Sequence, residues 1–204
     1  MGFILDKCTL RLYDEVILTS CKPFDCGHVD LNDFFINGVT NYSNELLGKT
    51  YCFTLDEDPS TIVCAFTVSI DSIKTSYLPN SRKKKVIKDI PHQKHMKSYP
   101  AVLIGRLGVN KDFRKIKGEE QRTGDQLMDF IKLWFIDKSY RTGCRFIVVD
   151  SYNEIVPLRY YSNNSFTLLF SSEEQEKEYT GLLSDDSLKT RSMYFDLILL
   201  KSSQ

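Results

Sequence analysis

Two neighbouring tyrosines, Tyr160 and Tyr161, stand in a short segment that could bring a phenol to a cleft. Residues 156–162 predict a short helix, in which successive side chains point about 100° apart. One tyrosine can therefore pack while the other faces a cleft, where its hydroxyl could form a hydrogen bond. Two partly buried aromatic side chains without a chemical role remain the plain alternative.

A second candidate is the polar loop at 115–124 (KIKGEEQRTG), which leads into a predicted helix. The first turn of a helix leaves backbone N–H groups unpaired and carries the positive end of the helix dipole, so such a loop can bind phosphates. Lys115, Lys117 and Arg122 add positive charge. The loop matches neither the Walker pattern nor GxGxxG, so an ordinary strand-to-helix connection stays open as the alternative.

The elements on either side of this loop are clear in the sequence. Residues 101–109 (AVLIGRLGV) are apolar on both faces except for Arg106, which predicts a central strand. From Gly124 to about Tyr140 a helix is predicted, because apolar residues recur at spacings of three and four: Leu127, Met128, Ile131, Trp134 and Phe135. The candidate loop therefore joins a central strand to an amphipathic helix.

Further strands are predicted at 9–13, 50–55, 62–70, 146–149, 166–170 and 194–200, and further helices from Asp30 and at 42–47. The strands at 50–55 and 62–70 form a hairpin across a polar connection. Residues 80–100 are interpreted as a long basic surface loop, and the acidic residues 172–178 as a solvated connection. This order predicts an α/β sandwich around a mixed sheet.

Composition limits the class of protein. The 204 residues balance 27 basic against 27 acidic side chains, so a nucleic-acid or membrane partner would need a local charged patch. No apolar run approaches the roughly 20 residues of a membrane span, and the first residues do not resemble a signal peptide, which predicts a cytoplasmic protein. The six cysteines lack metal-ligand spacing, so free thiols are predicted, buried at Cys52 and Cys64, and no metal site.

Together these segments resemble the GNAT acetyltransferase superfamily, in particular its toxin-type branch. The loop 121–126 (QRTGDQ) is similar to the family's (Gln/Arg)-x-x-Gly-x-(Gly/Ala), and 106–109 (RLGV) to its Arg-Leu-Ala-Val. Residues 160–166 (YYSNNSF) resemble Phe-Tyr-x-x-x-Gly-Phe, and 24–34 with 49–51 resemble the amino-terminal half of toxin-type members. Departures are a longer loop after Val109, Arg122 at a common glycine position, and Ser165 in place of the glycine before Phe166.

The resemblance implies a fold class of α/β (α+β) type. The implied GNAT fold has a mixed, mostly antiparallel sheet of six or seven strands, with helices on both faces. Residues 1–204 would form a single acetyltransferase domain with a basic loop insertion at about 80–100.

The resemblance also implies a reaction, the transfer of an acetyl group from acetyl-CoA to a primary amine. Tyr161 would be catalytic, protonating the departing thiolate of coenzyme A. Strand N–H groups would polarise the thioester carbonyl, loop N–H groups would hold the pyrophosphate, and a later loop would contact the cofactor. These cofactor-binding positions are Leu107, Gly108, Val109, Gln121, Arg122, Thr123, Gly124, Asp125, Gln126 and Asn153.

The acceptor amine is open. Toxin-type relatives acetylate the α-amine of aminoacyl-tRNA, and the basic stretch 82–97 could meet tRNA phosphates, although a solvated loop explains it equally well. A small-molecule or protein amine is the alternative acceptor, and a non-catalytic module that binds acyl-CoA or nucleic acid is the alternative of another class. Glu45, Asp71 and Glu154 are candidate bases, each with a solvated surface charge as its plain alternative. A homodimer is left open.

Overall fold

The computed structural model describes residues 2–91, 97–139 and 142–201, so His92, Lys94 and His95 of the basic stretch lie outside the described residues. Seven strands lie in the order β1-β2-β3-β4-β5-β7-β6, in a mixed and mostly antiparallel sheet, which confirms the predicted fold class. Contacts divide the chain into two compact units, residues 1–69 with 104–134 (unit 1) and residues 70–103 with 135–204 (unit 2). The single domain stays a prediction.

Unit 1 carries the candidate loop and the strands before it. Its elements are α1 (Phe3–Lys7), β1 (Cys8–Leu12), α2 (Glu15–Ser20), α3 (Val29–Asp33), a π-helix (Phe34–Gly38), α4 (Val39–Asn44), β2 (Lys49–Leu55), the start of β3 (Ile62–Lys74), the end of β4 (Ser98–Val109), a 3-10 turn (Lys111–Phe113) and most of α6 (Thr123–Ile136). β1, β2 and β3 pair antiparallel, which confirms the hairpin.

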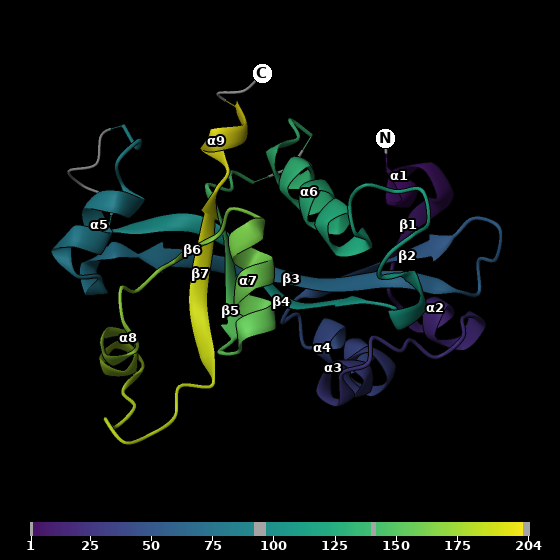
Figure 1. Cartoon of the computed structure of the whole chain (residues 1–204), viewed down its shortest axis with the longest axis horizontal. Helices are drawn as coiled ribbons and strands as arrows, with labels where there is room; N and C mark the ends of the chain where they lie inside the picture. The colour runs from purple at the N-terminus through teal and green to yellow at the C-terminus, as the bar shows by residue number, and fades with distance from the viewer. Residues whose placement is uncertain (1, 92–96, 140–141, 202–204) are drawn as a thin grey trace. The chain divides into compact units, whose positions relative to one another are not determined.

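Helices cover both faces of the strands in unit 1. The Tyr51 ring lies 4.9 Å from Trp134 of α6, and the Phe53 ring lies 4.9 Å from Phe130. Cys52, between them in sequence, packs instead in a cluster with Phe35 of the π-helix. This alternation is the period of a strand buried on both faces. Figure 1 shows α6 on one side of β2 and β3 and α3 and α4 on the other.

Unit 2 carries Tyr161. Its elements are the end of β3, a 3-10 turn (Thr75–Tyr77), α5 (Asn80–Val86), the start of β4, β5 (Phe146–Tyr152), α7 (Ile155–Asn163), β6 (Thr167–Leu168), α8 (Glu173–Thr180), β7 (Thr190–Asp196) and α9 (Ile198–Lys201). β7 pairs antiparallel with both β5 and β6. Phe146 and Val148 of β5 join a buried cluster with Val86 of α5, and Phe195 of β7 meets Phe166, which follows α7, at 5.7 Å.

The segment predicted as a long basic loop opens with a helix, so the loop prediction is wrong for α5. Val86 and Ile90 are buried in the core of unit 2 and hold this segment against the strands. Three apolar residues among many lysines gave too weak a periodic signal to predict a helix.

The prediction of a solvated connection at residues 172–178 is also wrong, because residues 173–180 form α8. The Ser172 side chain accepts from the backbone N–H of Gln175 at the start, and Gly181, with φ of 72°, ends the helix in the left-handed conformation. Glu176 in its middle is buried. Charge alone was therefore a poor guide to exposure.

Other boundaries move by a few residues. β7 ends at Asp196, where the sequence predicts a strand to 200, and only two residues of the strand expected at 166–170 pair as β6. α4 ends at Asn44, before the predicted end at residue 47, and Leu46 beyond it takes the left-handed conformation with φ of 57°. The six cysteines are free thiols, and Cys52 and Cys64 are buried as predicted. Across the described ranges no helix combines the length and apolarity needed to cross a membrane.

Candidate functional site

The end of β4 holds the first group of predicted residues. Leu107 and Val109 are half-buried and flank the buried Gly108. A Cβ at Gly108 would lie 3.1 Å from a ring carbon of Phe24 and 3.3 Å from the Cβ of Cys26, so the glycine lets that ring lie close against the strand. Gly108 stands where the family pattern Arg-Leu-Ala-Val has alanine, and the packing of Phe24 in unit 1 accounts for this difference.

The loop after β4 is fastened to its surroundings at several points. Asn110 donates from its backbone N–H to the carbonyl of Val63 at 2.9 Å and from its side-chain amide to the carbonyl of Ile62 at 3.0 Å. Arg114 donates to the carbonyl of Cys26 at 2.5 Å, and the Thr123 hydroxyl donates to the carbonyl of Phe113. The extra length of this loop is therefore held in place by hydrogen bonds.

The start of α6 decides which loop N–H groups are available. The N–H of Thr123 donates to the carbonyl of Arg114 at 3.3 Å, and the N–H groups of Asp125 and Gln126 donate to the carbonyl of Arg122 at 3.0 and 3.1 Å. Those of Gln121 and Arg122 have no hydrogen-bond partner within the part of the chain that the structure describes. Two N–H groups beside the positive end of a 14-residue helix thus remain for a ligand.

Gln126 has a role that its sequence position did not reveal. The side chain is 8% exposed, and its Oε1 accepts from the backbone N–H of Ile4 at 3.1 Å. Its Nε2 donates to Glu119 at 3.1 Å and to the carbonyl of Gln121 at 3.3 Å. The amide therefore joins α1 to the loop, where the family pattern has a glycine or alanine. An amide within the apolar stripe of α6 was the only sequence signal of this role.

Positive charge gathers on the same loop. Lys115, Lys117 and Arg122 are exposed, and Gly118 has a φ of 91° with open space where a Cβ would stand. A backbone in this conformation with no side chain can approach a bulky anion.

Tyr161 lies on α7 of unit 2, half-buried between aromatic rings. Its ring centroid is 5.1 Å from that of Tyr160 and 5.4 Å from that of Phe166. Among the described residues its hydroxyl has no hydrogen-bond partner. Because the side chain is half-buried and its hydroxyl is not fully enclosed, the phenol can meet a ligand and is a candidate proton donor.

Burial raises the pKa of Tyr161 above its ordinary value, and the negative charge of Asp150 raises it further. The phenol therefore keeps its proton throughout the neutral range. A general acid must hold its proton until the leaving group needs it, and this environment satisfies that condition.

Asn153 follows β5 in unit 2 and is engaged locally. Its backbone N–H donates to the carbonyl of Lys189 at 2.9 Å, and its side-chain nitrogen donates to Glu173 and to the carbonyl of Leu188, both at 3.0 Å. Among its side-chain atoms, the oxygen has no partner in the described residues.

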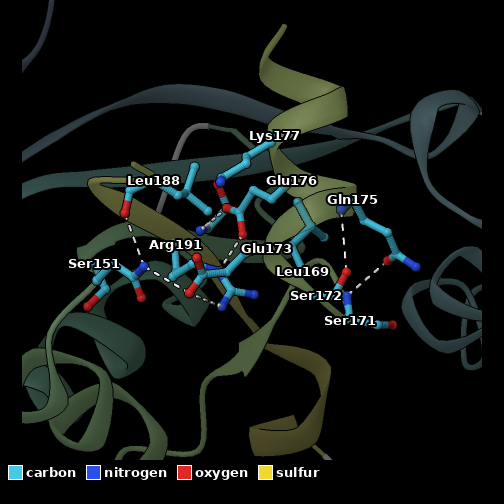
Figure 2. A network of polar contacts seen from close by, with 12 residues as sticks. Ser151, Leu169, Ser171, Ser172, Glu173, Gln175, Glu176, Lys177, Leu188 and Arg191 are labelled. Carbon is cyan, nitrogen blue, oxygen red and sulfur yellow. Dashed lines mark hydrogen bonds and ion pairs between the residues drawn. The ribbon is translucent and has the colours of Figure 1, made fainter. Parts of the chain in front are cut away.

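A buried ion pair is connected to Asn153 through Glu173, and no sequence pattern predicted it. Nε of Arg191 lies 2.7 Å from Glu176, whose second oxygen accepts from the backbone N–H of Ser192 at 2.5 Å. Figure 2 shows Glu173 and Glu176 of α8 both facing Arg191, with Glu173 at 3.8 Å. Arg191 is 7% exposed and Glu176 is 1% exposed. This network joins α8, β7 and the segment before α7.

The three candidate bases have different surroundings. Glu45 and Glu154 are exposed, as their plain alternative predicts. Asp71 is half-buried and lines a cavity of about 280 Å³ in unit 2, together with Asp150 and Glu176. Asp150 was not a sequence candidate, and its carboxylate accepts from the hydroxyl of Ser192 at 2.8 Å.

The predicted site residues divide between the two units. The strand and loop positions lie in unit 1, whereas Tyr161 and Asn153 lie in unit 2. In the described ranges no three His, Cys, Asp or Glu side chains are grouped as metal ligands would be.

Comparison with known proteins gives structural matches only. No protein-family model matches the sequence, and no curated protein matches it significantly. Among solved structures, a tyrosine-to-phenylalanine mutant of KacT is similar, with a TM-score of 0.67 and 17% identity over 98% of this chain and 100% of that chain.

Two structures containing AtaT are also similar. AtaT complexed with acetyl-methionyl-tRNAfMet has a TM-score of 0.63 and 16% identity over 96% of this chain and 98% of that chain. AtaTR bound with acetyl-CoA has a TM-score of 0.61 and 18% identity over 97% of this chain and 98% of that chain. At these identities the matches establish the architecture: this chain has the GNAT fold of KacT and AtaT.

Proposed function

We propose that this protein is an N-acetyltransferase that moves an acetyl group from acetyl-CoA to a primary amine, with the α-amine of an aminoacyl-tRNA as its acceptor. The observation that carries the proposal is Tyr161, whose ring packs against two aromatic rings while its hydroxyl has no partner among the described residues. It occurs in a fold whose solved neighbours include one bound with acetyl-CoA.

The residues present fit acetyl-CoA, which supplies an acetyl group already activated as a thioester. The unpaired N–H groups of Gln121 and Arg122, with the exposed basic side chains around them, suit a pyrophosphate. Strand N–H groups at Leu107–Val109 would polarise the thioester carbonyl. The remaining side-chain oxygen of Asn153 would meet an N–H of the pantetheine arm. Thr123, Asp125 and Gln126 would support the loop, because their N–H groups are already bonded.

Tyr161 acts at the departing sulfur. As the amine nitrogen forms its bond to the acetyl carbon and the carbon–sulfur bond breaks, the phenol donates its proton to the sulfur. The phenolate then recovers a proton, in balance with the one lost by the amine. Because burial and Asp150 raise its pKa, the phenol is still protonated when the carbon–sulfur bond breaks, so it can donate to the sulfur as negative charge develops there.

The tRNA acceptor rests on two observations. AtaT, with the same fold, was solved complexed with acetyl-methionyl-tRNAfMet. In this chain α5 exposes Lys84 and Lys85, with Lys88 exposed just beyond it, and such a run suits a phosphate backbone.

A small amine is the second candidate acceptor, and a specific feature favours it. The cavity of about 280 Å³ is lined by the carboxylates of Asp71 and Asp150 against one lysine, Lys74, while the third lining carboxylate, that of Glu176, is paired with Arg191. An ammonium group is the ligand that such a lining would hold.

Release of coenzyme A thiol with a panel of acceptors tests the proposal. The account expects release with aminoacyl-tRNA and strong loss in Tyr161→Phe. Release with small amines alone would select the second candidate. If acetyl-CoA binds but no amine gives release, the protein is a non-catalytic module. Growth arrest on expression, relieved by Tyr161→Phe, would support the toxin-like acceptor, and normal growth would count against it.

A further inference from the structure

A hollow of about 680 Å³ opens on unit 2 between the 3-10 turn after β3 and α8. It is lined by Tyr77, Leu78 and Pro79 on one side and by Gln175, Glu178 and Tyr179 on the other. None of these residues is among the acyl-transfer positions named above.

Two tyrosines form the aromatic part of this hollow. Tyr77 and Tyr179 are 65% and 46% exposed, and their ring centroids are 6.0 Å apart. Tyr179 also packs 4.9 Å from Phe170, which holds its ring in place. The two rings are tilted by 59° and Tyr179 packs on Phe170, so a flat base would stack on the exposed ring of Tyr77.

A basic helix begins where the hollow ends. α5 follows Pro79 directly, and the N–H of Lys83 donates to the carbonyl of Pro79 at 2.8 Å. Lys84, Lys85 and Lys88 are exposed and have no ion-pair partner among the described residues. Arg82 is different, because its Nε donates to the carbonyl of Leu169 at 2.9 Å, which joins α5 to the segment before α8. The lysines therefore project charge from a fixed support.

The polar side chains at the rim of the hollow favour different parts of an RNA from those that the lysines favour. Glu178 would repel a phosphate, but its carboxylate can accept from the amino group of a base. Gln175 also lines the rim, although its carbonyl already accepts from the N–H of Ser171 at 3.1 Å. A base is therefore favoured in the hollow and phosphates are favoured over the lysines.

We propose that this hollow and the adjacent lysines bind an unpaired stretch of RNA, with one base stacked on Tyr77 beside Tyr179 and the neighbouring phosphates on Lys84, Lys85 and Lys88. The inference rests on the proposed function in one respect, because an aminoacyl-tRNA acceptor supplies such an RNA. Aromatic faces beside a row of cations are the usual means of holding single strands.

Fluorescence titration of a short single-stranded RNA carrying 2-aminopurine tests this surface, because stacking on an aromatic ring quenches that base. The wild-type chain should bind and quench. Tyr77→Ala should weaken binding by about 5- to 100-fold and abolish quenching, since stacking contributes about 1–3 kcal/mol per base. Tyr77→Phe, which keeps the ring, should bind as the wild type does.

The lysines give an independent readout. Lys84→Ala with Lys85→Ala should weaken binding and reduce the slope of log affinity against log salt by about 1.4, or about 0.7 per phosphate contact. Wild-type affinity and quenching in Tyr77→Ala would overturn the proposal, and so would a wild-type chain that fails to bind RNA at low salt.

Failure of this surface is distinguishable from failure of the proposed function. Tyr77 lies outside the acyl-transfer residues, so Tyr77→Ala should leave acetyl-CoA binding unchanged. Conversely, Tyr161→Phe should leave RNA binding and quenching unchanged while turnover falls.

Discussion

The loop of unit 1 and helix α7 of unit 2 offer a ligand different kinds of groups. The loop offers backbone N–H groups, of which those of Thr123, Asp125 and Gln126 are already bonded. Helix α7 offers one side-chain hydroxyl, on Tyr161, that no described residue engages. Which backbone N–H groups can bind a ligand thus depends on the hydrogen bonds within the loop. The position of a side-chain hydroxyl depends only on the helix that carries it.

The two regions also differ in their supports. The loop is held by a neutral amide, Gln126, which joins it to Ile4 of α1. The segment before α7 is held through Asn153 and Glu173 to a buried ion pair, Arg191 with Glu176. Removing one partner of a buried ion pair leaves an uncompensated charge, so the support in unit 2 should be the more sensitive to mutation.

Glu176→Gln tests that difference and should have the largest effect. It leaves the 7% exposed Arg191 without its close carboxylate, and we expect the free energy of unfolding to fall by about 3–5 kcal/mol. Urea denaturation measures it. Glu173→Gln is the matched control, because that carboxylate lies 3.8 Å from Arg191 and is 43% exposed, so the loss should stay below about 1 kcal/mol. Equal losses would show that burial does not decide the effect.

Tyr161→Phe should lower turnover by about 10- to 1000-fold, which is the usual loss of one proton donor. The KM for acetyl-CoA and the melting temperature should change little, because the ring and its contacts remain. Steady-state thiol release gives both constants. Tyr160→Phe is the neighbouring control and should stay within about twofold of the wild type. Unchanged turnover in Tyr161→Phe would reduce this tyrosine to a packing residue.

Gln126→Ala tests the neutral support in unit 1. It leaves the N–H of Ile4 unpaired and frees the loop at Gln121, so we expect a loss of about 1–3 kcal/mol in stability. The KM for acetyl-CoA should rise while kcat stays close to normal, because Tyr161 is untouched. Gln121→Ala, at an exposed side chain, is the control. A fall in kcat without a rise in KM would contradict a role confined to the loop.

The last prediction concerns the buried thiol of Cys52 and the dependence of stability on pH. Burial raises the pKa of Cys52 in unit 1 from 9.0 to about 12. Because the folded pKa is the higher one, the thiol contributes stability fully below pH 9 and loses that contribution as pH rises from about 9 to about 12. Cys52→Ala should therefore lessen the alkaline fall in unfolding free energy by about 1 kcal/mol per pH unit, measured by urea denaturation at several pH values. An identical pH slope would mean that the folded thiol ionises normally. The effect of cavity formation is common to all pH values and does not alter this slope.

The fold could be predicted where apolar periodicity was strong. Residues 50–55 and 62–70 alternate their packing between two faces, and the stripe of α6 recurs at helical spacing, so hydrophobic burial alone specifies them. α5 and α8 could not be predicted, because their positions depend on a few contacts. Val86 is buried by residues far away in sequence, and Glu176 is buried because Arg191 meets it.

The candidate site divides in the same manner. Tyr161 could be identified from a short motif, since its helix and aromatic neighbours are local in sequence. The available N–H groups of the loop could not be identified, because the bonds to Arg114 and Arg122 decide them. Asp150 was missed because nothing in sequence links it to the cavity that it shares with Asp71.

The central claim is tested most directly by mass spectrometry of the acceptor after one turnover with acetyl-CoA and a mixture of aminoacyl-tRNAs. The account predicts one acetyl group on the α-amine of the aminoacyl end with the wild-type protein, and far less with Tyr161→Phe at equal acetyl-CoA binding. Bound acetyl-CoA with no acetylated amine, on tRNA or on any small amine added to the reaction, would contradict it.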